Sequence, residues 1–170
     1  MLIAGIDGSS NLTGISIFRD GQYIEHTLVD CHKIKDAEER LKKMACSICE
    51  YLDKFAVDKI IMEKSVLKTN IAVVQLLSML SGAVMLYAAQ HNIEFENPVP
   101  TEWRKRIGLE QSKNVKREVL KQEAIFAVKR EYGLSVTDDI AEAILIGRSG
   151  FDLPKLETCA DDVEIDHWGE

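Results

Sequence analysis

LIAGIDGSSNLTGIS, residues 2–16, runs from an apolar segment into a single acid, Asp7. Four of the five residues before Asp7 are apolar, which predicts a short buried strand with a carboxylate at its C-terminal end. Burying that carboxylate without a partner would cost several kcal/mol, roughly, so a cation or donor is expected beside it. The small residues 8–11 and the alternating residues 13–18 then predict a turn and a second strand that ends at Asp20-Gly21.

The composition is that of one soluble globular domain. The chain has 170 residues, of which 46% are hydrophobic and 29% are charged. It enters a strand pattern at Leu2 without a signal-peptide pattern, so the cytoplasm is the expected compartment. The four cysteines lack the spacing of a disulfide framework or a zinc site.

The remaining pattern predicts an α/β fold with a mixed five-stranded sheet, three strands antiparallel and the others parallel, flanked by helices. A third strand is expected at 22–29, a fourth at 58–63 and a fifth at 93–96. Helices are expected at 36–55, 69–92, 101–107, from Ser112 to about 132, and from about 137, with Val115, Val119, Leu120, Ala124 and Ala127 facing inward. The fourth strand repeats the opening pattern, because its apolar residues run directly into Glu63.

The 69–92 segment is apolar nearly all round. A buried helix is favoured over a membrane span, because the segment contains the polar residues Gln75, Ser78 and Ser81 and no basic flank follows it. One face is expected to cover the sheet. The other face of this helix is a candidate homodimer interface, because its small residues Ser78, Ser81 and Gly82 allow close approach.

The charge is unevenly distributed along the chain. The net charge is −7, yet residues 103–130 contain nine bases and three acids, while residues 151–170 contain seven acids and one base. We therefore expect one domain over 1–150 with a basic surface within it. We also expect a poorly ordered acidic tail over 151–170 that competes with DNA for this basic surface. A solvated helical face is the alternative interpretation of the basic stretch.

Four acids form the candidate site: Asp7, Glu63, Asp139 and Glu142. Clustered carboxylates repel one another unless divalent cations hold them, and oxygen ligands favour Mg²⁺ or Mn²⁺. Two such ions can support phosphodiester cleavage. For Asp138 and Asp139 a structural alternative carries equal weight, because acids in the first turn of a helix complement its macrodipole.

The chain resembles the RuvC-type Holliday junction resolvases of the RNase H-like superfamily, most closely the short bacteriophage versions. The resemblance rests on four motifs in this order: IAGIDGSSNLTG, IIMEK, a basic helix pair and DDIAEAILIG. The resemblance covers about residues 1–150 and implies an RNase H-like fold. It implies that Asp7, Glu63, Asp139 and Glu142 bind two Mg²⁺ or Mn²⁺ ions, with Asp138 as the fallback for Asp139. It also implies catalytic roles for Lys113 and Lys116, and DNA contacts from Arg104, Lys105, Arg106, Lys113, Lys116, Arg117, Lys121, Lys68 and Asn70.

The implied function is a homodimeric, metal-dependent endonuclease that makes paired nicks in branched DNA during recombination, repair or phage DNA processing. Its compartment would be the host-cell cytoplasm if a phage encodes it. The family's usual last acid is Asp, where this chain has Glu142. Residues 65–70 lack the aromatic residue that many members carry there, which predicts relaxed selectivity for four-way junctions and replication forks.

Two alternatives to this function remain open, and the chain length argues against a third. An RNase H-like nuclease could act on RNA or an RNA–DNA hybrid instead. A non-catalytic branched-DNA binding protein would not need the four acids. A sugar-kinase or actin-like ATPase shares the first Asp-x-Gly turn but needs a second domain, for which 170 residues leave no room.

Overall fold

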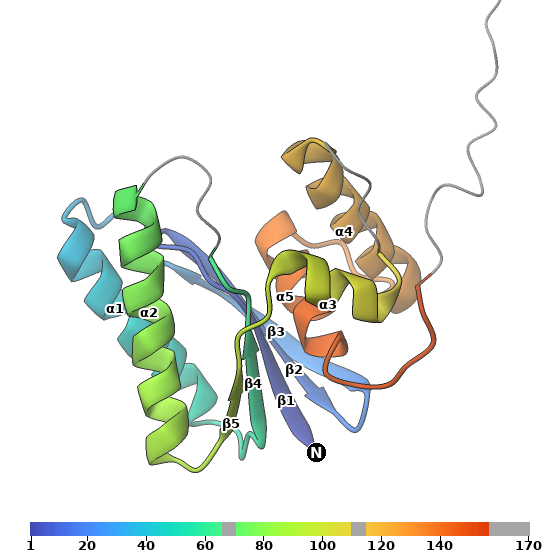
Figure 1. The fold of residues 1–170 in the computed structure, drawn as a ribbon, viewed down its shortest axis with the longest axis horizontal. Helices are drawn as coiled ribbons and strands as arrows, with labels where there is room; N and C mark the ends of the chain where they lie inside the picture. Colours follow the sequence, from blue (N-terminus) through green and yellow to red (C-terminus); the bar gives the residue numbers. More distant parts are fainter. Residues whose placement is uncertain (66–70, 110–114, 157–170) are drawn as a thin grey trace, which may run out of the picture.

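A mixed five-stranded sheet lies at the centre of the computed structural model, which describes residues 1–65, 71–109 and 115–156 (Figure 1). The strand order is β3-β2-β1-β4-β5. The strands are β1 (Leu2–Asp7), β2 (Leu12–Arg19), β3 (Gln22–Asp30), β4 (Lys59–Met62) and β5 (Glu94–Glu96). The first three pair antiparallel, while β4 is parallel to β1 and β5 is parallel to β4. The predicted α/β fold with a mixed sheet is therefore confirmed.

Helices cover both faces of the sheet (Figure 1). On one face lie α1 (Ala37–Leu52) and α2 (Ile71–Gln90); on the other lie α3 (Pro100–Ile107), α4 (Arg117–Tyr132) and α5 (Asp138–Arg148). Successive β1 residues alternate between the two cores, with Ala4 and Ile6 in one and Ile3 in the other. A strand buried on both faces explains the nearly continuous apolar run before Asp7.

Helix α5 packs against the backbone of β1 and β2 at glycine positions. A Cβ atom at Gly5 would overlap backbone atoms of Ala143 and Gly147, and one at Gly14 would overlap the carbonyl group of Asp139. The Ser16 hydroxyl donates a hydrogen bond to the carbonyl oxygen of Ala143 at 2.7 Å. These contacts fix the first turn of α5 beside the C-terminal end of β1.

Helix α4 differs from its predicted form. It begins at Arg117, with Lys116 as N-cap, and the predicted cap Ser112 lies outside the described residues. Val119 was expected to face inward, but it is 55% exposed; Ala124 and Ala127 are buried as expected. The inward assignment of Val119 is wrong because apolar residues occur on more than one side of α4, so their spacing does not define one buried face.

Helix α2 is also less buried than predicted. Leu80, Val84, Tyr87 and Ala88 enter the core, but large apolar side chains remain exposed at Ile71, Val73, Met79, Met85 and Leu86. By length and composition α2 could cross a membrane, and 17% of its most apolar window is buried. Its buried residues pack against α1 and β5, as in the core helix of a globular domain.

The core also continues past the predicted domain boundary at residue 150. Phe151 packs against the core that contains α5, and Leu156 is buried in it. The Leu156 N–H donates to the carbonyl oxygen of Ile107 at 2.8 Å. The rest of the predicted tail, residues 157–170, lies outside the described residues.

We expect Gly14→Ala to destabilise the protein, because its methyl group would meet the Asp139 carbonyl group rather than a flexible side chain. A loss of about 2 kcal/mol or more is expected, which is about 6 °C in melting temperature. Gly82→Ala is the matched control: this α2 glycine has no neighbouring atom within 4 Å of an added Cβ, so alanine should stabilise the helix by about 0.5–1 kcal/mol. Wild-type thermal stability in Gly14→Ala would contradict the close approach of α5.

Candidate active site

Two acids meet at the C-terminal ends of adjacent parallel strands. Ile6 of β1 is in register with Met62 of β4, so Asp7 and Glu63 occupy corresponding positions. The backbone N–H of Glu63 donates to the carbonyl oxygen of Ile6 at 3.1 Å. The prediction that parallel pairing brings these acids to one edge of the sheet is confirmed.

Two more acids come from the first turns of α5. The charges of Asp139 and Glu142 both act on Asp7, as does that of Glu63. Asp138 is instead paired with Lys121 of α4, which lowers the pKa of Asp138. Asp139, rather than the fallback Asp138, therefore belongs to the acid cluster, which we define as Asp7, Glu63, Asp139 and Glu142.

The cluster is electrostatically unfavourable in the absence of cations. Burial, followed by repulsion from the other three acids, raises the pKa of Asp7 well above its ordinary value. Burial is also the main cause that raises the pKa values of Glu63, Asp139 and Glu142. Within the described part of the chain, no hydrogen-bond donor or ion-pair partner meets the Asp7 carboxylate.

Helix α3 supplies partners for two of the four acids. The Trp103 indole Nε1–H donates to Glu63 Oε2 at 2.6 Å, and Arg104 Nη2 donates to Glu142 Oε1 at 2.5 Å. The Arg104 guanidinium also lies over the Trp103 ring, 4.5 Å from its centroid. Sequence reasoning missed both roles and placed Arg104 on a DNA-binding surface; that placement is wrong, because only 2% of Arg104 is exposed.

Arg117 is the cation that all four acids share. It is the first residue of α4 and is exposed, and its positive charge lowers the pKa of each member of the cluster. Lys116, immediately before it, is exposed as well. The two bases lie at the end of α4 that faces the acids, where they can meet an anion that approaches the cluster.

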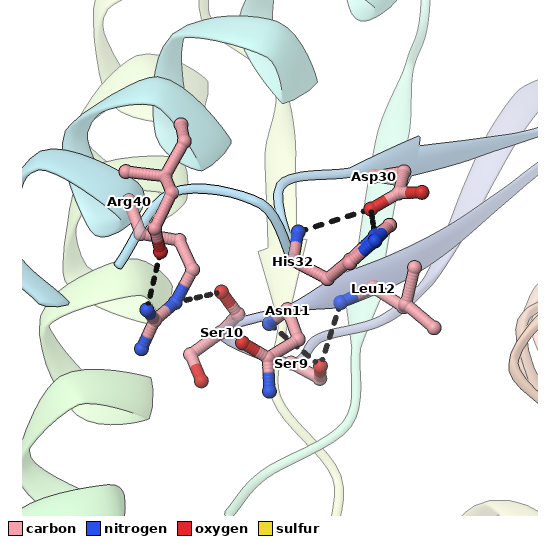
Figure 2. A network of polar contacts seen from close by, with 8 residues as sticks. Ser9, Ser10, Asn11, Leu12, Asp30, His32 and Arg40 are labelled. Atoms are coloured by element: carbon pink, nitrogen blue, oxygen red, sulfur yellow. Dashed lines mark hydrogen bonds and ion pairs between the residues drawn. The ribbon is translucent and has the colours of Figure 1, made fainter. Parts of the chain in front are cut away.

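The loop after Asp7 is held by local hydrogen bonds (Figure 2). The Ser9 hydroxyl accepts the N–H groups of Asn11 and Leu12, both at 3.1 Å. Arg40 of α1 donates through Nε to the carbonyl oxygen of Ser10 at 2.9 Å. The loop that follows Asp7 is therefore anchored to α1, which lies on the other side of the sheet from α5.

The other predicted DNA-contacting residues occupy different environments. Lys105 is exposed, and Arg106 pairs with Glu96 at 2.5 Å. Lys121 is engaged by Asp138. Lys113, Lys68 and Asn70 lie outside the described residues.

The donor set of the cluster fits hard divalent cations, because all four members are carboxylates and Asp7 has no hydrogen-bond or ion-pair partner in the described ranges 1–65, 71–109 and 115–156. Among the described residues, however, no three His, Cys, Asp or Glu side chains already form a ready ligand set. Glu63 and Glu142 are turned to Trp103 and Arg104. Binding a metal with all four acids would therefore require these two side chains to reorient.

Comparison with known proteins gives consistent matches. The family model for crossover junction endodeoxyribonuclease RuvC matches residues 3–146. The protein of that name from Pseudothermotoga lettingae is 27% identical over 111 residues, which are 63% of this chain and 68% of that protein. Among solved structures, Thermus thermophilus RuvC in complex with a Holliday junction substrate has a TM-score of 0.69 at 17% identity, covering 88% of this chain and 91% of that chain. The fowlpox virus resolvase, in complex with Holliday junction DNA, has a TM-score of 0.55 at 17% identity, covering 87% of this chain and 97% of that chain.

We expect Asp7→Asn to stabilise the metal-free protein at pH 8. A raised carboxyl pKa means that the folded state binds more protons than the unfolded state, so the contribution of Asp7 to stability falls as pH rises through the ordinary and then the folded pKa. The expected gain in EDTA is of the order of 1 kcal/mol, or about 3 °C, and it should shrink toward pH 5.

Asp138→Asn is the control of opposite sign. The pKa of Asp138 is lowered by Lys121, so its stabilising contribution is present at pH 8 and is lost as pH falls. Thermal melts between pH 5 and pH 8 would measure both variants. Destabilisation of the metal-free protein by Asp7→Asn at pH 8 would contradict the repulsive cluster.

Proposed function

We propose a mechanism of DNA cleavage on the following premise. This chain belongs to the RuvC family of crossover junction endodeoxyribonucleases. It is accordingly a structure-selective endonuclease that acts on branched DNA, with an RNase H-like fold. The observation that carries the proposed active site is the convergence of four acids from the ends of β1 and β4 and from α5, with no partner for the Asp7 carboxylate among the residues that the structure describes.

In this proposal Asp7, Glu63, Asp139 and Glu142 hold two divalent cations, Mg²⁺ or Mn²⁺. Bound cations of this kind activate water and stabilise the leaving oxygen in phosphodiester hydrolysis. The chain supplies the carboxylates from strand ends and from a helix packed on those strands, so their backbone positions are set before DNA binds, while the side chains of Glu63 and Glu142 turn from Trp103 and Arg104 to the metal. The indole of Trp103 orients Glu63.

The phosphate would be met by bases at the start of α4. Lys116 and Arg117 are exposed beside the acid cluster, and Lys113 precedes them in the chain. We assign Lys116 and Lys113 to steadying charge on the scissile phosphate, and Arg117 and Lys105 to contacts with the DNA backbone. Contacts of this kind give affinity that depends on salt and little on sequence.

Two copies of the site are needed to cut two strands, and α2 offers the surface for pairing. Helix α2 carries large exposed apolar side chains, and it lies on the opposite face of the sheet from α5 (Figure 1). A two-fold dimer through this surface would present two acid clusters to the two strands of a four-way junction or a fork. The proposed site of action is the cytoplasm, where such DNA is processed.

The deciding assay offers a four-way junction, a fork, linear duplex and an RNA–DNA hybrid to the protein with Mg²⁺ or Mn²⁺. We expect paired nicks near the branch, and a loss of at least about 100-fold in rate for Asp7→Asn and Asp139→Asn. Asp138→Asn is the matched control and should stay within about 10-fold of wild type, because Asp138 is turned to Lys121.

The same assay tests the alternatives. Cleavage of the hybrid alone would assign the protein to the ribonuclease alternative. Binding of branched DNA with no metal-dependent cutting would leave a non-catalytic binding protein. Equal losses for Asp138→Asn and Asp139→Asn would contradict the assignment of Asp139 to the cluster.

We expect Met85→Glu combined with Leu86→Glu to convert a dimer into monomers, since both side chains are more than half exposed on α2. Sedimentation equilibrium should show at least about a 100-fold weaker dimer, from the burial of two charges in an apolar interface. Phe126→Glu is the control, because Phe126 is an exposed apolar residue of α4 rather than α2. A monomeric wild-type protein, or dimers unaffected by the double substitution, would contradict the α2 interface.

A further inference from the structure

We propose that Arg104 is a positioning residue that serves as the buried counterion of the metal-free site, holding Glu142 until a divalent cation takes its place. The inference rests on the proposed metal site, and it concerns how that site is kept intact when empty and how readily it accepts an ion. It is carried by the burial of Arg104, by its contact with Glu142 and by the unpaired nitrogens on its guanidinium.

The burial of Arg104 separates it from the other bases near the acids. Its side chain is 3% exposed and that of Glu142 is 15% exposed, and their charged atoms are 2.5 Å apart. Arg117, by contrast, is exposed, so solvent and salt screen its charge. Arg104 is therefore the cation whose charge acts on Glu142 and Glu63 with least screening.

The guanidinium of Arg104 has few polar partners among the described residues. Its Nε and Nη1 atoms are buried without a hydrogen-bond partner among the described residues. Arg148, the other buried arginine, also has an Nε without a partner among the described residues, but it is bound through Nη1 to Tyr132 and Glu131 and through Nη2 to the carbonyl oxygen of Pro154. Arg148 thus serves the packing of the fold, whereas the one polar partner of Arg104 in the described structure is a member of the acid cluster.

Adjacent residues of α3 hold acids from two different elements. Trp103 donates to Glu63, which follows β4, while Arg104 donates to Glu142 of α5 and stacks on the Trp103 ring. The pair therefore draws Glu63 and Glu142 away from a common metal-ligand arrangement, in agreement with the lack of a ready ligand set among the described residues. A divalent cation must compete with Arg104 for Glu142.

This competition predicts the direction of an affinity change. Arg104→Gln removes the positive charge but keeps an N–H donor for Glu142, so it separates the charge from the hydrogen bond. The variant should bind Mn²⁺ at least roughly tenfold more tightly than wild type, because a divalent cation no longer enters a site that already contains a buried cation. A residue that only supported the structure of the site would weaken Mn²⁺ binding when replaced.

The experiment is a Mn²⁺ titration of the full chain, without DNA, followed by the electron paramagnetic resonance signal of free Mn²⁺. Arg106→Gln is the matched control: it makes the same charge change on the same helix, but Arg106 pairs with Glu96 outside the cluster, so its Kd should stay within about twofold of wild type. Arg104→Lys, which retains the charge, should also stay close to wild type. An unchanged or weaker Mn²⁺ affinity in Arg104→Gln would overturn the proposal.

Asp7→Asn separates this inference from the proposed metal site itself. If Asp7→Asn leaves Mn²⁺ binding unchanged, the proposed metal site is wrong. If Asp7→Asn abolishes Mn²⁺ binding while Arg104→Gln binds Mn²⁺ with the wild-type affinity, only the role of Arg104 is wrong. Should Arg104→Gln fail to fold, the arginine side-chain ¹⁵N spectrum of the wild-type protein replaces it. Saturating Mg²⁺ should then shift the Arg104 signal, and an unchanged signal in protein that binds Mg²⁺ would overturn the proposal.

Discussion

The close approach of α5 to the backbone of β1 and β2 is the constraint on which the site depends. Gly5 and Gly14 have no side chains to separate the helix from the strands, and Gly147 of α5 faces Ser16 and Phe18 in the same way. Larger residues at these positions would move the helix outward. The acids of α5 would move with it, because Asp139 lies directly over Gly14.

The fold holds together a group of charges that would otherwise separate. Burial and mutual repulsion both disfavour the ionised acid cluster, and its members come from different elements, so tertiary packing is needed to keep them close. That packing comes from apolar cores on both faces of the sheet. A site that destabilises the metal-free protein is consistent with a function that requires cations to bind there.

The sequence predicted those parts of the site that follow from local pattern. An apolar strand that runs into an acid identifies Asp7 and Glu63, and the helix between these strands implies that they meet at one edge. Local pattern could not choose between Asp138 and Asp139, because both lie in the first turn of α5. The choice depends on Lys121 of α4, a tertiary contact that no spacing in the sequence reveals.

The bases of α3 show most clearly why charge counting fails at this site. Arg104, Lys105 and Arg106 are consecutive, but a helix turns about 100° per residue, so they point in different directions. Arg104 is buried against Glu142, Lys105 is exposed, and Arg106 pairs with Glu96. With Lys121 engaged by Asp138, three of the bases counted toward a DNA-binding surface already have acidic partners in the protein.

Each base that is kept from a phosphate reduces the salt dependence of DNA binding by about 0.9 in the slope of log affinity against log salt concentration. The basic stretch therefore overstates the electrostatic affinity of this protein for DNA. Part of the positive charge of residues 103–130 is instead paired with acids of the protein itself, including Glu142 of the acid cluster. In the proposed dimer, selectivity for branched DNA would then depend on the placement of the two active sites more than on the total charge of the surface.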